Sequence, residues 1–148
     1  MFNPSQFLVK TEICKKVGGC DERIRHSQEY SLTLRLSQEG TFIKLNQNVA
    51  ILPFRAPGQI SENKIQQIYR VSKALELFLK DNERLKIKTR KKAFRRLTGR
   101  AWRFAKRYHK QTVFSRWFVL YLKGLFGFTK NLIEDCEEAN TVYLKKIN

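Results

Sequence analysis

The residues of this chain that are best suited to chemistry gather near the amino end, around a double glycine at positions 18 and 19. Glycine tolerates positive φ angles and lets the backbone approach a ligand closely. Asp21 and Glu22 present hydrogen-bond acceptors just after the glycines, His26 follows, and Glu29 brings a further carboxylate. A carboxylate in such a place can take the proton of an attacking hydroxyl group.

Each of these residues also has a purely structural interpretation. Glu29 falls in the first turn of an expected helix, where a carboxylate favours the helix dipole. Asp21 can accept hydrogen bonds from the backbone of its own loop, and His26 can be an ordinary solvated histidine. The combined pattern is more specific than any one member.

The elements that must position these residues are short. The patterns predict strands over 6–9, 41–45 and 49–52, a helical turn from 11 that the double glycine ends, and a helix over 28–38 capped by Ser27. A mixture of this kind predicts an α/β fold for the first part of the chain.

The motifs resemble the acceptor half of a family 2 glycosyltransferase of the GT-A type. The matching stretches are Gly18-Gly19-Cys20-Asp21-Glu22, His26-Ser27-Gln28-Glu29-Tyr30 and Leu34-Arg35-Leu36. The resemblance implies that residues 1–58 are the acceptor-side part of an α/β transferase domain. It also implies transfer of a hexose from a nucleotide sugar to a cell-surface glycan precursor.

The same resemblance implies roles for single residues. Glu29 would be the catalytic base, and Asp21, Glu22 and His26 would bind the acceptor. Arg55, in an aromatic-Arg element, would contact the phosphates of the donor.

The resemblance does not cover the donor half of the family's catalytic domain, which binds the nucleotide sugar. Family members hold a divalent cation, manganese or magnesium, through an Asp-x-Asp element, and the three aspartates here, Asp21, Asp81 and Asp135, are not spaced in that way. We therefore expect no metal ligands and no nucleotide-sugar binding by this chain alone. A missing segment or a second chain would have to supply the donor half.

The rest of the chain is strongly basic. The 148 residues carry 30 Lys and Arg against 13 Asp and Glu, a net charge of +17, and 13 basic residues but no acidic one lie between Arg84 and Lys110. Such an excess predicts an anionic partner. We expect residues 59–148 to form a helical, basic extension, with helices over 61–81 and 89–108.

Three interpretations of this basic extension remain open. Arg95, Arg96, Arg103 and Arg107, close to Trp and Phe residues, suit an anionic membrane surface. Nucleic acid is a second possible partner, although the sequence contains no motif of the known nucleic-acid modules. The third interpretation is a solvated or protein-covered face.

The cysteines and the absence of long apolar runs bear on where in the cell the protein is found. The three cysteines lack metal-ligand or redox spacing, which favours a reducing compartment. Charged residues interrupt the amino end, so we expect no signal peptide, and no apolar run reaches the length of a membrane span. We expect a cytoplasmic protein that can lie peripherally on the inner face of the membrane.

Overall fold

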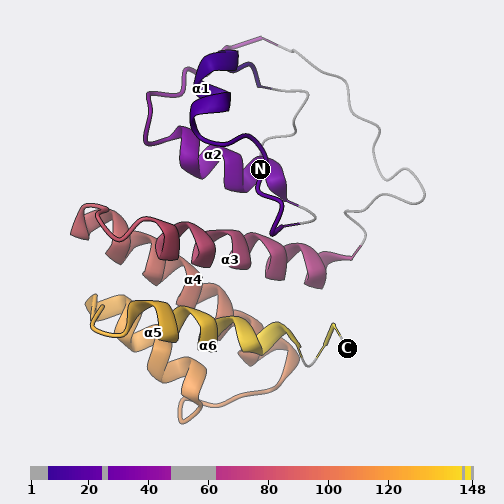
Figure 1. Ribbon diagram of the computed structural model, residues 1–148. Helices are drawn as coiled ribbons and strands as arrows, with labels where there is room; N and C mark the ends of the chain where they lie inside the picture. The colour runs from indigo at the N-terminus through magenta and orange to yellow at the C-terminus, as the bar shows by residue number, and fades with distance from the viewer. Residues whose placement is uncertain (1–6, 25–26, 48–62, 145, 148) are drawn as a thin grey trace. The chain divides into compact units, whose positions relative to one another are not determined.

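The computed structural model describes residues 7–24, 27–47, 63–144 and 146–147, and these residues form six helices and no strand (Figure 1). The helices are α1 (Thr11–Lys16), α2 (Gln28–Leu36), α3 (Lys64–Asp81), α4 (Ile87–Tyr108), α5 (Arg116–Phe126) and α6 (Leu132–Leu144). The chain divides into two compact units, Met1–Ala74 and Leu75–Asn148, and the division falls within α3.

The expected α/β fold is wrong for the described part of the chain. Residues 41–45 form no strand, although their pattern is typical of one, and Ile43 is 86% exposed. A strand needs a hydrogen-bonded partner and a surface against which its apolar side chains pack. Within the described residues this segment has no strand partner, and its large apolar side chains are exposed. Residues 7–9 are irregular too, and Leu8 is exposed.

Two other expectations fall on residues that the structure does not describe. The strand expected over 49–52 lies within residues 48–62, and so does the domain boundary expected between 58 and 59. Both stay predictions.

The double glycine ends α1. Gly18 and Gly19 have φ angles of 79° and 61°, which residues with a Cβ rarely adopt. The Gly19 N–H donates to the carbonyl of Cys14 at 2.9 Å and the Gly18 N–H donates to that of Lys15 at 3.0 Å. These are the paired bonds of a Schellman motif, so helix termination accounts for both glycines.

The second helix, α2, begins at the expected residue but without the expected cap. Ser27 has a left-handed backbone, and its side chain forms no capping hydrogen bond. The helix ends at Leu36 and buries Ser31 and Leu32 together with that residue. The prediction of its start is confirmed, and the prediction of side-chain capping by Ser27 is wrong.

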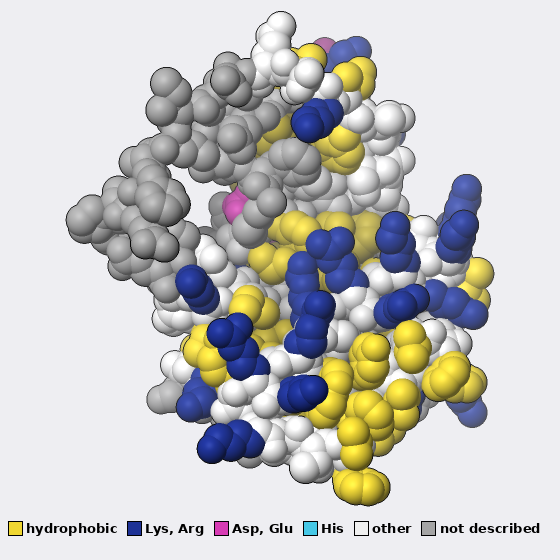
Figure 2. All heavy atoms as spheres, turned by 180° about the vertical axis from the view of Figure 1, so that it is seen from behind, with side chains coloured by type: hydrophobic (Ala, Val, Ile, Leu, Met, Phe, Trp, Pro, Cys, Tyr) yellow, Lys and Arg dark blue, Asp and Glu magenta, His cyan; other side chains and the backbone are white. Residues whose placement is uncertain are grey.

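The central helix of the second unit is α4, which packs against both α5 and α6. Its apolar stripe, with residues three or four positions apart, is buried and includes Phe94, Leu97 and Phe104. The Phe104 ring meets Tyr143 of α6 edge-on, with 4.8 Å between ring centroids. The other sides of α4 carry its basic residues. Lys and Arg side chains of the chain gather on the face shown in Figure 2.

An antiparallel hairpin joins α4 and α5. Trp102 near the end of α4 contacts Phe118 near the start of α5, with 5.1 Å between ring centroids. Further along, a Cβ added to Gly124 of α5 would lie 3.2 Å from the Cα of Arg95 and 2.2 Å from Oγ1 of Thr98. Glycine at position 124 therefore lets the two helices approach closely.

Polar contacts attach α6 to its neighbours. The buried Glu76 of α3 accepts a hydrogen bond from the Asn140 side chain of α6. Lys123 of α5 donates to Asp135 at 2.7 Å. Two weaker ion pairs, Lys80 with Glu137 and Arg116 with Glu138, lie nearer the surface. Asp135, Glu137 and Glu138 of α6 are thus paired with cations of their own unit.

Candidate functional site

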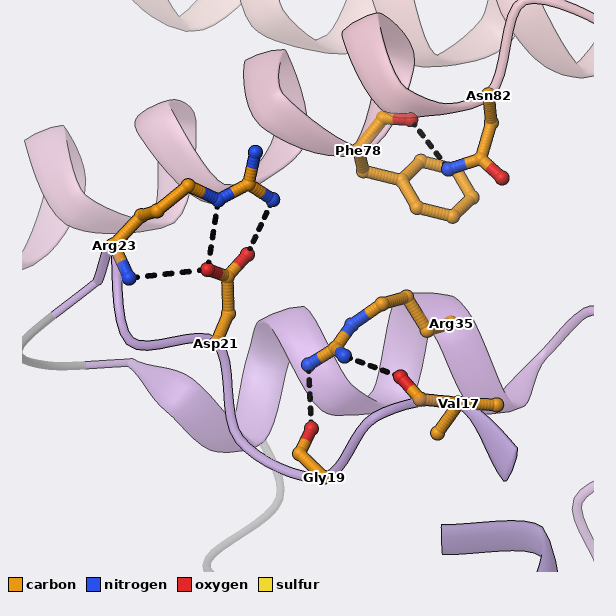
Figure 3. Close-up of polar contacts among 7 residues, drawn as sticks. All are labelled: Val17, Gly19, Asp21, Arg23, Arg35, Phe78 and Asn82. Atoms are coloured by element: carbon orange, nitrogen blue, oxygen red, sulfur yellow. Dashed lines mark hydrogen bonds and ion pairs between the residues drawn. The ribbon is translucent and has the colours of Figure 1, made fainter. Parts of the chain in front are cut away.

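Asp21, an expected acceptor-binding residue, is bound by Arg23 in the same loop. Arg23 donates to its carboxylate from Nε at 2.9 Å, from Nη2 at 2.8 Å and from its backbone nitrogen at 3.1 Å (Figure 3). These hydrogen bonds hold the pKa of the Asp21 carboxyl below its usual range. This arrangement is that of a carboxylate that braces its own loop.

Arg35 of α2 connects this loop to the helix. Its Nη1 donates to the carbonyl of Val17, and its Nη2 donates to that of Gly19 at 2.7 Å (Figure 3). The guanidinium therefore satisfies carbonyl groups at the end of α1, where the helix itself leaves acceptors without partners. The sequence pattern included Arg35, but nothing in its spacing indicated this contact.

Glu29, the expected catalytic base, lies half-buried in the first turn of α2. Its backbone carbonyl accepts a hydrogen bond from Thr33 Oγ1 at 2.6 Å. Among the described residues, no hydrogen-bond donor bridges its carboxylate to that of Asp21, which is bound by Arg23, and Glu22 is exposed. His26 and Arg55, the other expected site residues, lie outside the described residues.

The described residues offer no group of ligands for the divalent cation implied by the resemblance. Among the described residues, no three His, Cys, Asp or Glu side chains are grouped as metal ligands would be. Asp21 is held by Arg23 and Asp135 is held by Lys123. Two of the three aspartates thus already bind cations of the protein itself.

Comparison with known proteins gives no relative for this chain. No family model matches it, and neither a curated protein nor a solved structure matches it. Together with the absence of strands from the described part, this finding overturns the resemblance to family 2 glycosyltransferases. The shared pattern was short, and glycines after a helix and a carboxylate at a helix start also arise from helix termination and capping. Hexosyl transfer stays a prediction, because neither the structure nor the comparisons test it.

A different candidate site lies on α4 and α5. Residues 84–133 contain 16 Lys and Arg and no Asp or Glu. Exposed cations run along the side of α4 that faces away from its buried stripe: Lys88, Lys92, Arg96, Arg103, Lys106 and Arg107. None of these six forms an ion pair with a carboxylate of the described chain. They are available to an external anion.

The outward side of α5 is apolar. The helix buries Trp117, Leu120 and Gly124, and its opposite side carries only apolar residues: Phe118, Val119, Leu122, Leu125 and Phe126. Phe126 is 67% exposed, and Val119 and Leu125 are exposed as well. A surface helix of a globular protein normally has polar residues on that side. We call this set the outer face of α5.

Exposed phenylalanines extend the outer face at both ends of α5. Phe114, just before the helix, is 93% exposed, and Phe128, just after it, is 65% exposed. In the lower right of Figure 2, hydrophobic side chains gather beside Lys and Arg, and no Asp or Glu side chain is drawn in that part of the picture. The second unit therefore presents an apolar surface bordered by positive charge.

The amino end of α4 keeps positive charge where the helix itself disfavours it. Lys86 is the N-cap residue, Lys88 lies in the first turn, and the first turn has no acidic residue. A cation near a helix amino end costs up to about 1 kcal/mol. A local cost of this kind, here cations placed against the helix dipole, is expected at binding sites.

Sequence reasoning found the basic residues of this site but not its outer face. In the sequence, Trp and Phe residues lie close to these cations, but that proximity does not place them on one side of a helix. A signal was available, because the run Phe118, Val119, Leu122, Leu125 and Phe126 leaves no polar side opposite the buried residues of a helix.

Proposed function

We propose that the protein is a peripheral membrane-binding module that attaches to anionic bilayers through α4 and α5. The observation that carries the proposal is the outer face of α5, which lies beside the exposed cations of α4. A bilayer surface offers partners for both, since its acyl boundary accepts apolar side chains and its headgroups bring negative charge.

The orientation follows from the residues. With α5 lying flat on the bilayer, Phe114, Phe126 and Phe128 enter the boundary between headgroups and acyl chains, and the cations of α4 reach the lipid phosphates. Each Lys or Arg near an anionic surface contributes about 1 kcal/mol, and each apolar side chain adds in proportion to the area it buries. None of the described helices is both long and apolar enough to cross a membrane, and this mode of attachment does not require one.

Nucleic acid is the competing partner, because the same cations would neutralise phosphates and aromatic side chains can stack on bases. The outer face of α5 favours the membrane. Val119, Leu122 and Leu125 are aliphatic and have no partner on a polyanion, whereas they gain from leaving water in a bilayer. We propose the cytoplasmic leaflet as the surface, since its lipids are anionic.

Vesicle sedimentation tests this function. We expect binding to phosphatidylcholine vesicles that contain phosphatidylglycerol and little binding to phosphatidylcholine alone. Reversing four charges of α4 with R95E, R96E, R103E and R107E should release the protein.

The matched control reverses four exposed cations outside α4 and α5, with K10E, K15E, K44E and K146E. This variant has the same net charge as the first and should keep most of the binding. An equal loss of vesicle binding in the two variants would contradict a specific binding surface on α4. RNA binding that is tighter than vesicle binding and falls steeply with salt would favour nucleic acid instead.

A further inference from the structure

The side chain of Lys91 in α4 lies across Gly127, the C-cap residue of α5. A Cβ added to Gly127 would lie 2.9 Å from Cδ, 3.0 Å from Cε and 3.3 Å from Nζ of Lys91. The end of the lysine side chain therefore runs directly over the glycine backbone. Gly127 has a φ angle of 73°, so the position favours glycine for its backbone as well as for this contact.

Exposed apolar residues neighbour both partners of this contact in the chain. Phe126 and Phe128 flank Gly127 in the chain, and their ring centroids are 6.3 Å apart. Ile87 lies one turn before Lys91 on the same side of α4 and is also exposed. The ammonium group thus lies against Gly127, the residue that links two exposed phenylalanines.

Nothing in the described chain neutralises this ammonium group. Lys91 is exposed and forms no ion pair with a carboxylate among the described residues. Lys88 and Arg95 lie one turn before and one turn after it on the same side of α4 and add further positive charge. The carbonyl end of α5 favours a cation at this place, which helps to hold Lys91 over Gly127.

We propose that Lys91, Phe126 and Phe128 form a binding site for the phosphate group of an anionic phospholipid. The proposal rests on the membrane function above and assigns one specific lipid contact to it. With the two phenylalanine rings below the headgroups, the ammonium group over Gly127 lies at the level of the phosphates. It donates charge-assisted hydrogen bonds there, in a layer less polar than water.

Two variants with the same change in charge test the site. Lys92 is the next residue of α4 and is also exposed, whereas the three atoms nearest to a Cβ on Gly127 all belong to Lys91. K92Q should weaken binding to phosphatidylglycerol vesicles about fivefold, the effect of one surface cation. K91Q should weaken it about twentyfold, because it also removes the phosphate hydrogen bond. K91R keeps a donor cation and should restore most of the binding.

Gly127→Ala tests the position of the cation without changing its charge. The new Cβ would displace the end of the Lys91 side chain, and we expect a loss of vesicle affinity larger than that of K92Q. The left-handed backbone makes this variant less stable, so its helical circular dichroism must match the wild type at the temperature of the titration.

The possible outcomes separate this site from the general function. Failure of the wild type to bind anionic vesicles would overturn both proposals. Wild-type binding with equal losses for K91Q and K92Q would overturn the lipid site alone. Inorganic phosphate should not bind measurably or displace the vesicles. If it bound as tightly as the vesicles, the site would be one for a free phosphate group and the lipid assignment would be overturned.

Discussion

Gly124 of α5 lies against Thr98 of α4 so closely that a Cβ at position 124 would come within 2.2 Å of the Thr98 hydroxyl oxygen. Thr98 is fully buried, and its hydroxyl group donates to the carbonyl of Phe94 at 2.9 Å. This contact sets the separation of the two helices. It therefore determines how the outer face of α5 lies beside the cations of α4.

Gly124→Ala should destabilise the second unit. The methyl group has no room, because the backbone of α4 at Arg95 lies on the other side of it. We expect a loss of about 1–3 kcal/mol in the free energy of unfolding, as for other overpacked sites. Gly99→Ala in α4 is the control, since its Cβ would meet Tyr121 only at 3.8 Å. Better helix propensity should make that variant slightly more stable. Urea unfolding measures the free energy of unfolding of both variants. A Gly124→Ala protein as stable as the wild type would refute the close contact.

Lys123→Met should cost more stability than Lys80→Met. The first change leaves the carboxylate of Asp135, whose side chain is 7% exposed, without its cation. We expect a loss of about 2 kcal/mol, below the value for a fully buried pair because the Lys123 side chain is 40% exposed. The Lys80 and Glu137 side chains are 57% and 47% exposed, so losing that pair should cost less than about 1 kcal/mol. Thermal unfolding compares the two, and equal losses would be inconsistent with this difference in burial.

Asp21→Asn should destabilise the amino-terminal loop in a pH-dependent way. The Arg23 hydrogen bonds lower the pKa of Asp21 in the folded protein, so the folded state favours the ionised carboxyl. Its stabilising effect is complete above the unfolded pKa of about 4 and is lost as the pH falls through the lower folded value. We expect the free energy of unfolding of the wild type to exceed that of the variant by about 1 kcal/mol at pH 7, and this difference to shrink toward pH 2. A difference that stays constant over this range would contradict the role of the ionised carboxylate.

Helix periodicity predicted the parts of the fold that depend on local pattern. The buried stripe of α4 follows from its 3.6-residue repeat, and the double glycine after α1 ends that helix as expected. The strand over 41–45 was predicted from a pattern that does not specify a partner, and a strand exists only when another segment completes its hydrogen bonds.

The candidate site depended on contacts that no local pattern contains. The basic residues of α4 were evident from composition, but their position beside the outer face of α5 requires the hairpin. Likewise, the contact of Lys91 with Gly127 joins residues 36 positions apart. The hydrogen bonds from Arg23 to Asp21 likewise depend on the fold of their loop, which the spacing of the carboxylates does not contain.

The most direct test of the membrane function is the affinity of a triple variant, F114S, F126S and F128S, for phosphatidylglycerol vesicles. The net charge of this variant equals that of the wild type, so any difference comes from the exposed phenylalanines. We predict that the wild type binds and that the variant binds about a hundredfold more weakly, since three large apolar side chains no longer leave water. Equal affinity of the two proteins, or no binding by the wild type, would contradict the insertion of α5 into the bilayer surface.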